Sequence, residues 1–76
     1  MYAILTAMAT YSSREIIVLL RADGWYEVAQ EGSHRQFKHP TKAGRVTVKD
    51  PQKDIPAGTA RSIFRQAGLN WRARRR

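Results

Sequence analysis

The chain contains two segments in which hydrophobic residues recur at the spacing of an α-helix, separated by a segment in which they alternate. The first helical segment begins at Ser12, and Ser12 and Glu15 have the S-x-x-E spacing of a capping box. Its apolar positions follow at i, i+3 and i+4: Ile16, Leu19 and Leu20, with Ile17 beside them. Gly24 can adopt a positive φ, which is typical of the residue that follows a helix. The pattern predicts a short helix between Ser12 and Gly24.

From Trp25 onward the hydrophobic pattern changes to a period of two, which is typical of β-strands. Three short segments fit this period: residues 25–30, 34–39 and 45–49. They are connected by two turns, at residues 31–33 and 41–44, and both turns contain glycine. Such short connections between successive strands predict an antiparallel meander.

A second helical segment follows Pro56, since proline suits the first turn of a helix. Its apolar residues lie at i, i+3, i+4 and i+7: Ala60, Ile63, Phe64 and Ala67. Gly68 is expected to end the helix, and Leu69 to fold back onto Phe64 or Ile63. The element order is therefore α-β-β-β-α. We predict an α+β fold in which two helices cover one face of a three-stranded antiparallel sheet and leave the other face open.

The parity of the strand positions assigns residues to the two faces of this sheet. Phe37, Val46 and Val48 are expected to point to the helices. The residues expected to be buried together are Leu20, Phe37, Val48, Ile63 and Phe64. The open face then carries a histidine and several cations among polar residues: His34, Gln36, Lys38, Arg45, Thr47 and Lys49.

Composition narrows the class of protein. The 76 residues are enough for one small domain. The absence of cysteine excludes a disulfide framework, a thiol nucleophile and a Cys-type zinc site, and it favours the cytoplasm. Fourteen basic against six acidic residues give a formal charge of +8, and the segment between residues 35 and 53 is basic by itself. This surplus predicts an anionic partner: nucleic acid, a membrane surface or an acidic protein.

Residues 1–11 and 71–76 flank the predicted domain, which we place at residues 12–70. The first flank is apolar, too short to span a bilayer and without the basic flank of a signal peptide, so we expect a loosely held extension. An additional strand or ordered arm is the alternative, and a translation start at Met8 would also explain the segment. The last flank contains four arginines and is expected to be a flexible tail that adds non-specific affinity for nucleic acid.

An ordered series of motifs runs through the predicted domain: GWY from Gly24, GSHRQFKHP from Gly32, VTV from Val46, KDIPAGT from Lys53 and IFRQAGL from Ile63. From about Ser13 to Leu69 this series resembles the HicA toxin family. The resemblance implies a double-stranded-RNA-binding-domain-like fold and mRNA interferase activity, with His34 as the one catalytic histidine. Many relatives have a second histidine where this chain has Arg35, so His34 is the only histidine of the GSH turn here.

The resemblance also implies partners. It implies a HicB-like antitoxin that inhibits the toxin, with operator DNA contacted only through the complex with this antitoxin. The substrate that it implies is mRNA.

The residues present support RNA cleavage without a metal or other cofactor. A histidine titrates near neutral pH, so His34 can transfer a proton during cleavage. Gly32 and Ser33 form the turn before it, and Lys38 can stabilise the negative charge of the phosphorane. No carboxylates have metal-ligand spacing, so no metal site is predicted. His39 has the opposite strand parity and is expected to be structural, so His34 is expected to act alone, with Ser33 or water as possible help.

Five cations of the basic middle segment are candidates for contacts with RNA phosphates: Lys38, Lys42, Arg45, Lys49 and Lys53. Trp25 and Tyr26 have rings that can stack on bases, although packing is expected for at least one of them. The leading hypothesis is a toxin ribonuclease that cleaves single-stranded mRNA in the cytoplasm, with no membrane partner. The alternatives are a non-catalytic RNA- or DNA-binding module on the same scaffold, and a domain whose basic face only docks an acidic protein.

Overall fold

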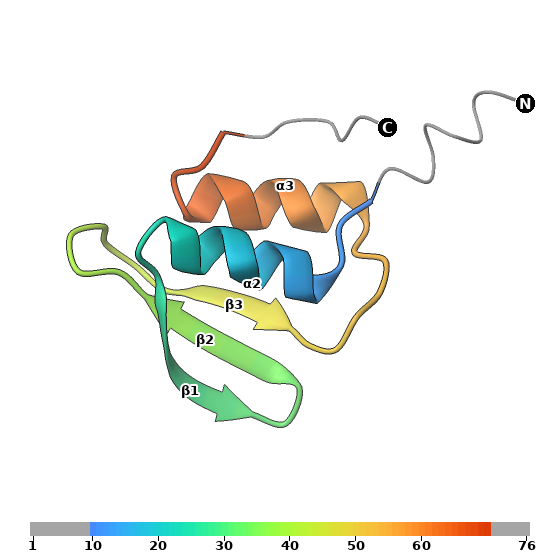
Figure 1. Ribbon diagram of the computed structural model, residues 1–76, viewed down its shortest axis with the longest axis horizontal. Coiled ribbons are helices and arrows are strands. Elements are labelled where there is room, and N and C mark those ends of the chain that lie inside the picture. The colour runs from blue at the N-terminus through green and yellow to red at the C-terminus, as the bar shows by residue number, and fades with distance from the viewer. Residues whose placement is uncertain (1–9, 71–76) are drawn as a thin grey trace, which may run out of the picture.

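The computed structural model describes residues 10–70, which form two helices and a three-stranded sheet (Figure 1). The elements along the chain are α2 (Ser13–Ala22), β1 (Tyr26–Glu31), β2 (His34–Lys38), β3 (Val46–Lys49) and α3 (Ala57–Gln66). The strands are antiparallel in the order β1-β2-β3, and Figure 1 shows both helices on the same side of the sheet. The predicted α+β class and the αβββα order are confirmed.

Helix α2 begins with the predicted capping box. The Ser12 hydroxyl accepts a hydrogen bond from the Glu15 N–H at 3.1 Å, and the Glu15 carboxylate accepts one from the Ser12 N–H at 2.9 Å. The buried face of the helix differs by one residue from the predicted stripe. Ile17 is buried, whereas Leu19 is 41% exposed, because the helix turns a slightly different side to the sheet.

Helix α3 begins after Pro56, which occupies the N-cap position and not the first turn. Gly68 has a φ of +70° and ends the helix, as predicted. The Leu69 N–H donates to the Phe64 carbonyl at 2.8 Å, and the Leu69 side chain packs against the core. The predicted fold-back of Leu69 is confirmed.

One core lies between the helices and the sheet. All five residues predicted to be buried together belong to it: Leu20, Phe37, Val48, Ile63 and Phe64. Trp25 joins them at 2% exposure, with its indole N–H donating to the Asp23 carboxylate at 3.2 Å. Trp25 therefore precedes β1 as a packing residue, and Tyr26, at 48% exposure, begins the strand.

The ordered domain begins before Ser12. Tyr11, which the sequence pattern placed in the extension, is buried, and its ring meets that of Phe64 edge-on at 5.2 Å. Its carbonyl accepts the Ile55 N–H at 2.8 Å in a short antiparallel bridge. Tyr11 therefore packs with the core, because a distant segment buries its ring, and the domain bounds of residues 12–70 stay a prediction. Residues 1–9 of the extension and the arginine tail lie outside the described residues.

Candidate active site

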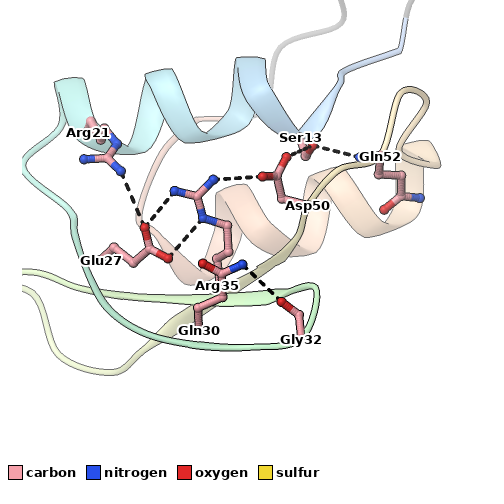
Figure 2. Close-up of polar contacts among 8 residues, drawn as sticks. All are labelled: Ser13, Arg21, Glu27, Gln30, Gly32, Arg35, Asp50 and Gln52. Carbon is pink, nitrogen blue, oxygen red and sulfur yellow. Dashed lines mark hydrogen bonds and ion pairs between the residues drawn. The ribbon is translucent and has the colours of Figure 1, made fainter.

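The turn between β1 and β2 fixes the position of His34. It has two central residues, Gly32 with a φ of +59° and Ser33 with a negative φ, which is the pattern of a type II′ hairpin turn. The Gln30 side-chain amide donates to the Gly32 carbonyl at 3.1 Å (Figure 2). The Ser33 carbonyl accepts the Asp50 N–H at 2.8 Å, which ties the turn to the end of β3. His34 therefore lies at the start of β2, next to a turn held from both sides.

The register of the strands places side chains in rows across the sheet face that the helices leave uncovered. His34 pairs with Lys49 on one side and with Glu31 on the other. Two residues further along β2 the row consists of Ala29, Gln36 and Thr47. Lys38 pairs with Tyr26 in the next row, about 13 Å from His34 along the strand, at roughly 3.3 Å per residue. We call this surface the open face.

The open face carries three of the five predicted RNA-binding cations. Lys49 is exposed there in the same row as His34, and Lys38 is exposed at the far end of β2. Arg45 donates to the Gln36 side-chain oxygen at 2.6 Å, which holds its guanidinium against β2. A polyanion lying along β2 would therefore meet a cation near each end of the strand.

The other two cations lie elsewhere. The Lys42 ammonium donates to the Asp23 carboxylate at 2.6 Å and to the Ala67 carbonyl at 2.9 Å, so it links the end of α2 to the end of α3. The hydrogen bond from Lys42 is the main reason that the pKa of Asp23 is lowered. Lys53 follows β3 and lines a hollow of about 420 Å³ together with Arg14 and other residues at the start of α2. Their assignment to RNA binding stays a prediction, and Lys42 is already bound to the protein itself.

The two histidines have different surroundings. His39 accepts hydrogen bonds at Nδ1 from the N–H groups of Thr41 and Lys42, both at 3.1 Å. With Nδ1 accepting, the proton belongs to Nε2, which donates to the Asp23 carbonyl at 2.7 Å. Its ring also meets Trp25 edge-on at 5.2 Å. His34 is exposed and makes no hydrogen bond or ion pair with another residue in the described range 10–70, so it is the histidine available for a ligand.

Arg35 lies on the other face of the sheet, at the centre of an ionic network under α2 (Figure 2). Its guanidinium donates twice to Glu27, at 2.7 and 3.0 Å, and once to Asp50, at 2.8 Å. Asp50 also accepts a hydrogen bond from the Ser13 hydroxyl, and this bond, followed by the one from Arg35, lowers the pKa of Asp50. The hydrogen bonds from Arg35 lower the pKa of Glu27, and the two carboxylates in turn raise the pKa of Arg35. The residue next to His34 is thus structural, a role that sequence analysis did not assign.

Sequence analysis also assigned no role to Glu31. The structure places it directly opposite His34, on the same face. The signal was present in the sequence, because a two-residue turn at Gly32 and Ser33 makes its flanking residues neighbours.

The described range, residues 10–70, contains neither a metal-binding cluster nor a helix that could span a membrane. No three or more His, Cys, Asp or Glu side chains in this range gather closely enough to hold a metal ion. No helix in the same range is long and apolar enough to cross a membrane.

The fold and the open face define a small basic αβββα domain. Its exposed His34 lies among cations on the sheet face that the helices leave uncovered. The family model described as HicA toxin of bacterial toxin-antitoxin matches residues 13–69. The chain therefore belongs to the HicA toxin family, and membership in a toxin–antitoxin family implies an antitoxin partner. No curated protein matches the chain.

Proposed function

We propose that this toxin is an endoribonuclease that cleaves mRNA on the open face, with His34 as a catalytic residue. The observation that carries the proposal is the contrast between the two histidines. His39 is bonded at both ring nitrogens, whereas His34 is exposed, uncommitted and flanked by Lys49. Membership in the HicA toxin family supports the assignment of His34 in the GSH turn.

RNA contains its own nucleophile, so the enzyme has little covalent chemistry to supply. The 2′-hydroxyl loses a proton and attacks the adjacent phosphorus, and the 5′-oxygen leaves with a proton. His34 carries one of these proton transfers, a contribution of roughly 10²–10⁴-fold. Lys49 in the same row and Lys38 further along β2 stabilise the additional negative charge of the transition state. No step requires a metal ion.

Binding and catalysis use the same surface in this proposal. The phosphates of a single strand follow β2, with Lys49 near the scissile phosphate and Lys38 and Arg45 about two residues of RNA away. Gly32 and Ser33 support the reaction because their turn fixes the start of β2, where His34 lies. Lys53 lies on the loop after β3, where it would contact a phosphate of the RNA beyond the end of the sheet.

The antitoxin partner is a HicB-like protein that silences the toxin by covering His34. Membership in a toxin–antitoxin family implies an antitoxin partner, and a partner that occupies the active face would block access of RNA to His34. Because that face is basic, carboxylates of the partner would compete with RNA phosphates. A stable complex would bury roughly 800 Å² on each partner. Both proteins would meet mRNA in the cytoplasm, and operator DNA would be contacted only through the complex.

The test is incubation of the purified protein with RNA in EDTA. The wild type should cleave the RNA, and His34→Ala should not. Gln66→Ala, at an exposed position of α3, is the matched control and should cleave like the wild type. Circular dichroism shows whether each variant is folded. A folded His34→Ala variant that cleaves at the wild-type rate would contradict the assignment.

The same experiment separates the alternatives. RNA binding without cleavage, unaffected by His34→Ala, would favour a non-catalytic nucleic-acid-binding module. Loss of all RNA affinity at moderate salt would favour a domain that docks an acidic protein.

A further inference from the structure

Five of the six carboxylates of the chain have structural roles. All six lie in the described range, and five accept hydrogen bonds from identified donors: Glu15 from Ser12, Asp23 from Lys42 and Trp25, Glu27 from Arg35, Asp50 from Ser13 and Arg35, and Asp54 from Thr10. Glu31 is exposed and has no such partner among residues 10–70. It is therefore the one carboxylate that the fold does not explain.

Glu31 stands next to the one histidine that the fold does not explain either. Glu31 and His34 are the residues that flank the two-residue turn, and they are directly paired across β1 and β2. Side chains at such a position lie on the same face, with Cβ atoms about 4.5–5.5 Å apart. Lys49 pairs with His34 from the other side. The row Glu31, His34, Lys49 thus presents a carboxylate, an imidazole and an ammonium in order.

We propose that Glu31 and His34 form the acid–base pair of the ribonuclease, with Glu31 as the base. This inference rests on the proposed function and supplies the second proton-transfer group that a single histidine lacks. The Glu31 carboxylate takes the proton of the 2′-hydroxyl as this oxygen bonds to phosphorus. The bond from phosphorus to the 5′-oxygen breaks, and protonated His34 gives its proton to that oxygen. The products are a 2′,3′-cyclic phosphate and a 5′-hydroxyl.

No proton is gained or lost over the cycle. After cleavage Glu31 is protonated and His34 is neutral, and exchange with water restores both. Lys49 remains charged throughout and faces the phosphorane oxygens. The active form therefore needs Glu31 ionised and His34 protonated, which gives a bell-shaped pH dependence with the carboxylate on its acidic limb.

The charged groups that face this pair are few. In the row of Glu31 and His34 the other charged residue is Lys49. Further along the open face the charged residues are Lys38 and Arg45. The carboxylates of Glu27 and Asp50 bind Arg35 on the opposite side of the sheet. Both helices lie on that side of the sheet as well (Figure 1).

The negative charge of Glu31 allows a catalytic base to be distinguished from a residue that takes no part in the reaction. A carboxylate on a face that binds RNA repels phosphate, so an inert Glu31 would only weaken binding. Its replacement by glutamine would then lower KM and leave kcat unchanged. A base predicts the opposite result, a loss of kcat without a rise in KM.

The first experiment measures kcat and KM of Glu31→Gln against pH on a short RNA. We expect kcat to fall by about 100-fold or more and the acidic limb of the pH profile to disappear. Asp54→Asn is the matched control, since it removes the same charge from an exposed site before α3, and it should retain wild-type kinetics. A Glu31→Gln variant with kcat within about threefold of the wild type, and with the acidic limb intact, would overturn the proposal.

The second experiment assigns base and acid. In RNA with a 5′-bridging sulfur, the leaving thiolate needs no proton. We expect His34→Ala to regain cleavage of this substrate and Glu31→Gln to remain inactive. Rescue of Glu31→Gln would overturn its role as the base. If His34→Ala is inactive on ordinary RNA while Glu31→Gln is fully active, this inference fails and the proposed function survives. If the wild type cleaves no RNA, both fail.

Discussion

Neutralising the two lysines of the open face should change the salt dependence of RNA binding by a calculable amount. The perturbation is Lys38→Gln with Lys49→Gln, made in His34→Ala protein so that binding is measured without cleavage. Each phosphate contact on a single strand contributes about 0.7 to the slope of log K against log salt. The structure places both lysines exposed on one face, with no other partner in residues 10–70, so the slope should fall by about 1.4 units. Between 50 and 200 mM salt this is about a sevenfold smaller loss of affinity.

The assay is fluorescence anisotropy of a labelled RNA oligonucleotide over this range of salt. The contribution of the arginine tail is the same in both proteins, so the difference in slope isolates the open face. Arg61→Gln with Arg65→Gln removes the same charge from exposed positions on α3 and is the control. An unchanged slope in the lysine variant, or an equal change in the control, would show that RNA does not bind along β2.

Three further changes have definite expected outcomes. Phe64→Ala should lower the free energy of unfolding by roughly 3–5 kcal/mol, because the ring is buried against Tyr11. Urea denaturation measures this change, and a variant as stable as the wild type would contradict the packing of α3. Acid should lower Tm below about pH 5, because lowered carboxyl pKa values stabilise the fold only above the ordinary carboxyl range, and this contribution is lost as the pH falls. Arg35→Met should lower Tm at pH 7 and flatten this dependence, and an equally steep curve would refute the role of the network. Tyr26→Ala should weaken binding of single-stranded RNA by roughly 5- to 150-fold through lost stacking, with Tyr26→Phe close to the wild type in the same titration; equal affinity of all three proteins would exclude stacking.

The elements of the fold were predictable because each has a local signal. The hydroxyl and the carboxylate of the capping box lie within one turn of helix, and Gly68 needs its positive φ whatever surrounds it. Alternation assigned Phe37 and the β3 valines to the core correctly, since parity needs no knowledge of the partner strand.

Two departures from the sequence-based expectations share a different cause, because they depend on residues far apart in the sequence. Tyr11 is ordered by Ile55 and Phe64, and no pattern near Tyr11 indicates these contacts. The ammonium of Lys42 donates to the Asp23 carboxylate and to the Ala67 carbonyl at the end of α3, although nothing in the sequence distinguishes Lys42 from the other lysines of the basic segment. Parity placed His34 on the open face, whereas its pairing with Glu31 follows from the register across the turn, a local signal that the sequence analysis did not use.

The ionic network around Arg35 restricts which residues position 35 can accept. Its guanidinium makes three hydrogen bonds to two carboxylates, whereas a histidine has at most two N–H groups and is largely neutral at physiological pH. Replacing Arg35 with histidine, the residue that the family resemblance associates with this position, would leave Asp50 without the guanidinium that binds it and Glu27 with the longer ion pair to Arg21, at 3.6 Å. A histidine at position 35 alone would therefore weaken the contacts that join β1 to the end of β3 under α2, so such a variant would test the stability of the domain as well as catalysis.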